Sequence, residues 1–159
     1  MRSSRFARTL ILAHVLAGMG LAGLPPAALA VDSETSEAPD LVGVRAKIKA
    51  KDFNAANSEL ETMIDQGVQQ ADVYNLMGFS LRKSGNLDRA YSFYRKALEF
   101  EPDHKGALEY LGELYVERGE IGKAREHERH LAALCPDGCE ELSDLRLAIA
   151  EAAATPAKK

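Results

Sequence analysis

Apolar residues recur every three or four positions along much of the chain, in runs that are separated by short polar segments. Two consecutive runs in residues 71–104 show this spacing clearly, and Gly85 lies in the segment between them. Such spacing is typical of helices with one buried face, and glycine is common just beyond a helix end. The pattern therefore predicts two antiparallel helices joined by a short loop. The apolar positions are Tyr74, Met77, Leu81, Leu87, Tyr91, Tyr94 and Leu98.

The same pattern returns after 34 residues without a gap, so residues 71–104 and 105–138 are two units of a repeat. A fixed period of this length predicts a solenoid, in which each unit stacks on the next to bury its apolar face. Moving back by the same period gives a degenerate first unit at residues 40–70, where Val44 replaces a glycine. The matched pairs are Tyr74 and Leu108, Met77 and Leu111, Gly78 and Gly112, Gly85 and Gly119, Ala90 and Ala124, and Pro102 and Pro136.

Aromatic, aliphatic, small and proline residues occupy fixed places in the unit, namely Tyr74, Met77, Gly78, Leu81, Ala90, Tyr94, Ala97 and Pro102. This order, at this period, resembles the tetratricopeptide repeat. The resemblance implies an all-α fold, an α-α superhelix of about three helix pairs in residues 40–153, with a capping helix at residues 139–153. Glu128 and Leu131 depart from the pattern, because an aromatic and a small residue are usual there. We also expect Asp103 to cap the helix that follows it.

The first 30 residues predict a secretory signal peptide that is cleaved after Ala30. They contain three arginines near the start, an apolar run and a final A-x-A cleavage site. The alternative is a membrane anchor, but glycines and a proline pair interrupt the run. We therefore expect an exported bacterial protein, periplasmic or secreted, with no membrane contact after cleavage. Residues 31–39 are acidic and polar, which predicts a disordered lead-in, and residues 154–159 form a small polar tail.

Charge and motifs exclude several functional classes. Cleavage would leave 17 basic and 24 acidic residues, a net charge of −7, which makes nucleic acid a poor partner. The sequence contains no glycine-rich phosphate loop and no serine elbow. We therefore expect neither enzymatic activity nor a cofactor.

In tetratricopeptide proteins the first helix of each unit lines a concave face that binds a partner. The resemblance places on this face Arg45 and Lys49 from the first unit, Asn75, Phe79, Arg82 and Lys83 from the second, and Glu109, Glu113 and Glu117 from the third. A groove that is basic at one end and acidic at the other is expected to bind a peptide or protein partner through its charge pattern. The alternative is that these charges only solvate the helices. The oligomeric state is left open.

A second cluster lies near the C-terminus. In an exported protein the pair Cys135 and Cys139, which flank a Pro-Asp-Gly turn, predicts a disulfide. The alternative function is a periplasmic metal- or thiol-handling protein, in which His127 and His130 join the two cysteines as ligands of copper or zinc. The CPDGC segment resembles the copper-binding loop of the Sco family of copper chaperones, although that family has a different fold.

Overall fold

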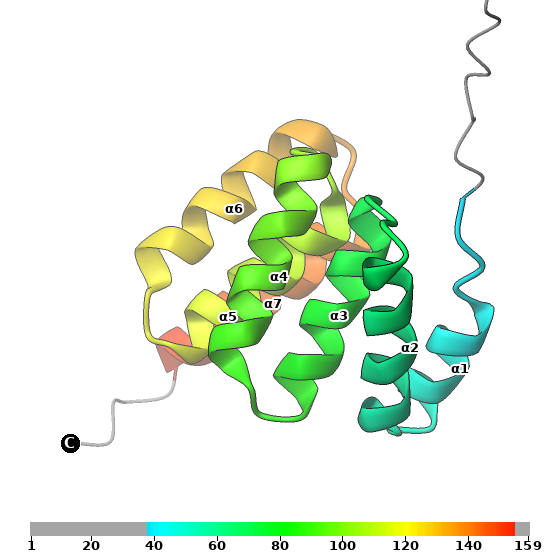
Figure 1. The fold of residues 1–159 in the computed structure, drawn as a ribbon. Coiled ribbons are helices and arrows are strands. Elements are labelled where there is room, and N and C mark those ends of the chain that lie inside the picture. The colour runs from blue at the N-terminus through cyan, green and yellow to red at the C-terminus, as the bar shows by residue number, and fades with distance from the viewer. Residues whose placement is uncertain (1–37, 155–159) are drawn as a thin grey trace, which may run out of the picture. The chain divides into compact units, whose positions relative to one another are not determined.

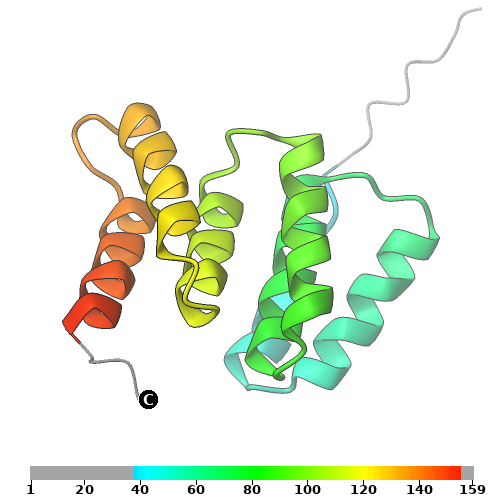
Figure 2. The ribbon, with the colours of Figure 1, turned by 90° about the vertical axis from the view of Figure 1, so that its left-hand side faces the viewer.

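The computed structural model describes residues 38–154, which fold into seven helices and contain no strand. Figure 1 labels the helices, and Figure 2 shows them following one another across the molecule from α2 to α7. Consecutive helices pack side by side, and α5 also packs along α7. The helices are α1 (Val42–Lys49), α2 (Phe53–Asp65), α3 (Ala71–Lys83), α4 (Leu87–Phe100), α5 (Lys105–Glu117), α6 (Ile121–Leu134) and α7 (Glu140–Ala154). The predicted all-α helical solenoid is confirmed.

The turns that join helices within a unit share one backbone geometry. At the end of α3 the N–H of Gly85 donates to the carbonyl of Arg82, and the N–H of Asn86 donates to that of Leu81. This pair of bonds is the Schellman motif, whose central residue has a positive φ. Gly85 has a φ of 86°, and Gly119 in the next unit has a φ of 73°. The turn therefore favours glycine at this place in the repeat.

Small residues set the distance between the two helices of a unit. Ala56, Ala90 and Ala124 stand one period apart, and all three are fully buried. A Cβ atom added at Gly78 would lie 2.6 Å from Cδ1 of Tyr94, which is itself fully buried. The aromatic ring of α4 therefore packs directly against the backbone of α3, because the glycine leaves room for it.

The other units replace this glycine–aromatic pair in different ways. In the first unit, Val44 takes the glycine position and Leu60 the aromatic position, and both are fully buried. In the third unit, a Cβ atom at Gly112 would lie 2.7 Å from Cδ1 of Leu145, so a side chain of α7 fills the space. A larger residue on one side is thus matched by a smaller one on the other.

Helix α7 continues the repeat as a further first helix. Leu142, Leu145 and Ile149 follow Leu108, Leu111 and Tyr115 by one period, and all six are buried. Arg146 stands where the second and third units have Gly78 and Gly112, and its Nε donates to Oε1 of Glu128 at 3.0 Å. Glu128 stands where the repeat has an aromatic residue, and Arg146 stands where it has glycine. The ion pair between them takes the place of the glycine–aromatic contact of the second unit.

One expectation about capping is wrong. The N-cap of α5 is His104, whose Nδ1 accepts from the N–H of Ala107, while Asp103 contacts His130 instead. The predicted signal peptide of residues 1–30, most of the lead-in at 31–39 and most of the tail at 154–159 lie outside the described residues.

Candidate functional site

The helices α1, α3, α5 and α7 carry one surface, which we call the odd-helix face. Ion and ring contacts join neighbouring members: Arg45 of α1 lies 3.6 Å from Asp72 of α3, and the Phe79 ring of α3 lies 5.0 Å from the Tyr110 ring of α5. The charges along this face change sign with the repeat. One position recurs as Lys49, Lys83, Glu117 and Glu151, at intervals of one period. The face is therefore basic toward α1 and acidic toward α7.

A hollow of about 580 Å³ opens at the basic end, between α1, α2 and α3. We call it the lysine-rimmed hollow; it is lined by Ile48, Lys49, Lys51, Phe53, Phe79 and Lys83. Its three apolar side chains are half-buried, and those of Ile48 and Phe79 pack against the core. Its three lysines are exposed, and within residues 38–154 none of them lies at ion-pair distance from a carboxylate. Apolar contact and unneutralised positive charge thus meet at one place.

The backbone at Lys51 is unusual. Lys51 is the one residue other than glycine with a positive φ in the described part of the chain, at 60°. It stands one period before Gly85 and two before Gly119, and it makes the same turn, since its N–H donates to Ile48 and that of Asp52 to Lys47. A side chain in this conformation costs about 1–2 kcal/mol relative to the right-handed helix. The first unit therefore keeps a strained lysine where the other units have glycine.

At the middle of the face, Arg82 is buried and neutralised. Its Nη1 donates to Oε1 of Glu117 at 2.7 Å, and its Nη2 donates to Glu113. Its side chain is 5% exposed. A guanidinium that bridges α3 to two carboxylates of α5 holds the helices in register, because leaving the buried positive charge of Arg82 unpaired would be costly.

A second hollow, of about 340 Å³, lies between α3, α5 and α7, and we call it the acidic hollow. Three glutamates line it, and Lys83 lies at its border with the lysine-rimmed hollow. Its lining is Arg82, Lys83, Glu113, Val116, Glu117, Ala148, Glu151 and Ala152.

Nearby, Glu109 is buried among other carboxylates. Burial, and after it the negative charges of Glu113, Asp144 and Glu141, together raise the pKa of Glu109 to about 8. Glu109 is therefore largely protonated at neutral pH. The acidic end of the face contains more carboxylates than it can ionise together, so a cation placed beside them would be favoured.

The nine residues predicted to line the groove fall into three groups. Four are exposed: Arg45, Lys49, Lys83 and Glu117. Two are half-buried: Phe79 and Glu113. Three are buried, and their placement on an open groove is corrected: Asn75, Arg82 and Glu109 are 5%, 7% and 7% exposed. They were misplaced because contacts with the next helix cover the part of α3 and α5 that they occupy.

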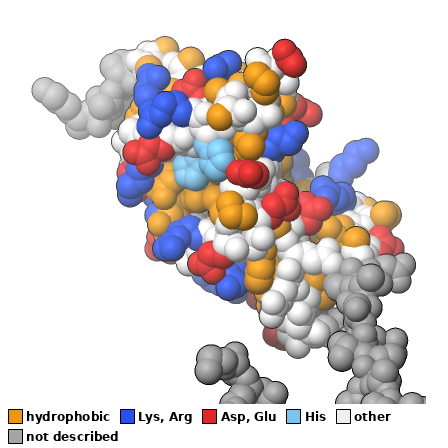
Figure 3. Space-filling view, turned by 90° about the horizontal axis from the view of Figure 1, so that it is seen from above, with side chains coloured by type: hydrophobic (Ala, Val, Ile, Leu, Met, Phe, Trp, Pro, Cys, Tyr) orange, Lys and Arg blue, Asp and Glu red, His pale blue; other side chains and the backbone are white. Residues whose placement is uncertain are grey.

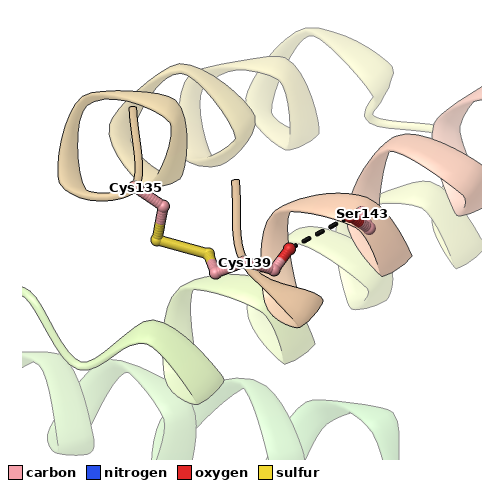
Figure 4. Close-up of a disulfide and its surroundings, with 3 residues drawn as sticks. All are labelled: Cys135, Cys139 and Ser143. Carbon is pink, nitrogen blue, oxygen red and sulfur yellow. Dashed lines mark hydrogen bonds between the residues drawn. A yellow bond between two sulfur atoms is a disulfide. The ribbon is translucent and has the colours of Figure 1, made fainter. Parts of the chain in front are cut away.

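The structure does not assemble the alternative metal cluster. The sulfurs of Cys135 and Cys139 are joined, with their Cα atoms 5.8 Å apart, a separation that a disulfide spans without backbone movement (Figure 4). The His127 ring stacks on that of Tyr115 at 5.6 Å, and burial lowers the pKa of His127. His130 contacts Asp103 at 2.8 Å. In residues 38–154 no group of three or more His, Cys, Asp or Glu side chains is placed to hold a metal ion.

Histidine–aspartate contacts occur along one edge of the solenoid, where α3 and α5 begin and α6 ends. Figure 3 looks down on this edge and shows His side chains, in pale blue, beside acidic ones, in red. His104 uses Nδ1 to cap α5, so its proton is on Nε2, which faces Oδ1 of Asp72 at 3.1 Å. These contacts fix a helix start and a loop, which is a structural role.

Sequence reasoning missed three features of the site. It did not single out Lys51, although its alignment with Gly85 and Gly119 was available as a signal. It missed Tyr110, because no repeat pattern places an aromatic there, and it treated α7 only as a cap, although Asp144 approaches Glu109.

No described helix combines the length and the apolar character needed to cross a membrane.

These observations define the class of the protein. Residues 81–137 match the tetratricopeptide repeat family, and this match agrees with the seven helices of residues 38–154, the turn geometry that the units share and the paired small residues. The chain is an all-α helical solenoid of the tetratricopeptide type.

Three proteins show the similarity, each over part of its length. The chain is 33% identical over 92 residues to the probable biofilm formation methyltransferase WspC of Pseudomonas putida, a match that covers 58% of this chain and 22% of that protein. It is 35% identical over 81 residues to BBSome complex member BBS4 of Bos taurus, covering 50% and 15% respectively. It is 32% identical over 62 residues to the uncharacterized protein ycf37 of Pyropia yezoensis, covering 39% and 35%. The chain thus spans roughly a third of the length of these relatives or less.

Proposed function

We propose that this protein is a non-enzymatic scaffold that binds a protein or peptide partner across its odd-helix face. The observation that carries the proposal is the change of sign along one repeat position, from Lys49 and Lys83 to Glu117 and Glu151. Charges that were only needed for solubility would be mixed along the face, whereas a graded face favours one orientation of a bound segment. Tetratricopeptide proteins generally bind protein partners, and one relative is named as a member of a complex.

The partner lies along the face with its acidic part toward α1 and its basic part toward α7. The two hollows on either side of Lys83 give such a segment places for side chains, and Phe79, whose ring contacts that of Tyr110, supplies apolar surface in the lysine-rimmed hollow. An extended peptide or one helix has the dimensions to contact several repeats at once. Affinity then comes from several modest contacts, and specificity comes from the charge order.

The setting is part of the proposal. The signal-like first 30 residues favour export, so the scaffold acts in the periplasm or outside the cell. An oxidising compartment permits the disulfide between Cys135 and Cys139, which ties the end of α6 to the start of α7. This places the covalent link beside the helix that contributes Asp144 and Glu151 to the acidic end.

A pull-down with matched charge reversals tests the function. Lys83→Glu and Asp144→Lys change exposed residues on the odd-helix face, and Arg125→Glu changes an exposed residue of α6 as the control. We expect both face variants to lose most of the partner that the unaltered protein retains from the exported fraction, with unchanged helical circular dichroism. If the face variants retain partners as well as Arg125→Glu does, the odd-helix face is not the binding surface.

A further inference from the structure

The lysine-rimmed hollow contains a lysine that the turn itself disfavours. The same Schellman turn is made by Gly85 and by Gly119 one and two periods later, and only at Lys51 does it contain a side chain. Glycine at position 51 would relieve the strain without changing the turn. A strained residue that persists beside a hollow indicates that its side chain is used there.

The three ammonium groups of the hollow approach from different elements. Lys49 is at the end of α1, Lys51 is in the turn, and Lys83 is at the end of α3. The Lys83 Nζ lies 5.3 Å from the centre of the Phe79 ring. Three like charges around one hollow repel one another, and within residues 38–154 no carboxylate lies at ion-pair distance from any of them, so an anionic group that binds there relieves the repulsion.

The floor of the hollow limits the kind of anion. Ile48, Phe53 and Phe79 offer apolar surface, and the volume of about 580 Å³ accommodates more than a small inorganic ion. A phosphate alone would contact the lysines of the rim and leave the apolar floor exposed to water. An apolar side chain with carboxylates on either side of it would use both the floor and the rim.

We propose that the lysine-rimmed hollow binds a segment of a protein partner in which an apolar side chain is flanked by Asp or Glu, and that Lys51 is a specificity-determining residue of this site. The inference rests on the proposed function, because it names the part of the partner that occupies the basic end of the odd-helix face. Lys51 pairs with a carboxylate next to the apolar anchor, and Lys49 and Lys83 hold the carboxylates further out.

The test uses a short fluorescein-labelled peptide with both ends blocked, in which Leu and Phe are flanked by Asp and Glu. A matched peptide contains Asn and Gln in place of the acids. Binding is measured by fluorescence anisotropy with protein purified after expression of the full chain. We expect the acidic peptide to bind about tenfold more tightly than the neutral one, and the difference to shrink as salt rises.

Four variants separate binding from stability. Lys51→Arg keeps the charge, Lys51→Gln removes it but keeps the strained side chain, and Lys51→Gly removes both. We expect about tenfold weaker binding for the Gln and Gly variants and nearly unchanged binding for the Arg variant. Lys105→Gln, at an exposed lysine outside the hollow, is the control and should bind as the unaltered protein does.

The outcomes are distinct. If the acidic peptide binds no better than the neutral one, or if Lys51→Gln and Lys51→Gly bind it normally, the inference is overturned. If the inference is overturned in this way while Asp144→Lys still abolishes partner capture in the pull-down, the proposed function stands and only the identity of the bound segment is wrong.

Discussion

Replacing Lys51 by glycine should stabilise the protein, and the size of the effect can be worked out from the turn. The left-handed conformation costs a lysine about 1–2 kcal/mol. Replacing lysine by glycine removes this strain, but glycine also costs about 0.5–1 kcal/mol because it is more flexible in the unfolded chain. The net expectation for Lys51→Gly is an increase of about 0.5–1 kcal/mol in the free energy of unfolding, which raises the Tm of a domain of this size by about 3 °C.

The second unit provides a control by the reverse substitution, from glycine to lysine at Gly85. Gly85 makes the same turn with a φ of 86°, and a Cβ atom there would meet nothing within 4 Å. Gly85→Lys should therefore lower the Tm by about as much as Lys51→Gly raises it, for backbone reasons alone. Differential scanning calorimetry of both variants checks the pair. If Lys51→Gly leaves the Tm unchanged or lowers it while Gly85→Lys destabilises, Lys51 makes stabilising contacts in the free protein that outweigh the strain, and the reasoning is refuted.

Three further perturbations probe the site and the packing. Glu109→Gln should raise the free energy of unfolding at pH 8 by on the order of 2 kcal/mol and change it little at pH 5. Because the pKa of Glu109 is raised to about 8 in the folded protein, the folded state loses stability as the pH rises from the ordinary glutamate pKa toward 8. Urea unfolding at the two pH values checks this, and an equal difference between the two proteins at both pH values would contradict it. Gly78→Ala should destabilise by about 2–3 kcal/mol, because its methyl group would meet the buried ring of Tyr94, and an unchanged midpoint of unfolding would show that the ring can move aside. Cys135→Ser should lower the stability of the oxidised protein by about 2 kcal/mol and that of the reduced protein hardly at all, so an equal effect under both conditions would argue against a disulfide.

Much of the fold could be predicted because the same pattern of small, apolar and glycine residues recurs in successive units of the repeat. The recurrence of Gly78 as Gly112 and of Ala90 as Ala124 fixes both the helix pairs and their stacking, and the turn glycine at 85 and 119 fixes the helix ends. Such local rules depend on spacing alone, so a sequence is sufficient to read them. The continuation of the pattern into α7 was also present in the sequence, at Leu142, Leu145 and Ile149.

The site was less predictable because its properties depend on neighbouring helices. Helical spacing places Arg82 and Glu113 on the same face, but only packing shows that they neutralise each other and leave the face less charged than its sequence suggests. Burial of Glu109 likewise comes from the approach of α7. Asp103 appeared to be a suitable cap by residue type, whereas the backbone gives that position to His104. In each case a tertiary contact decides between two locally acceptable roles.

The measurement that tests the central claim most directly is site-specific photo-crosslinking in cells that produce the full chain. A photoreactive amino acid is placed at position 83 on the odd-helix face and, in a second strain, at position 125 on α6, and the adducts are identified by mass spectrometry. The scaffold account predicts a discrete protein adduct from position 83, at a segment rich in Asp and Glu, and none from position 125. Adducts that form from position 125 but not from position 83 would contradict it.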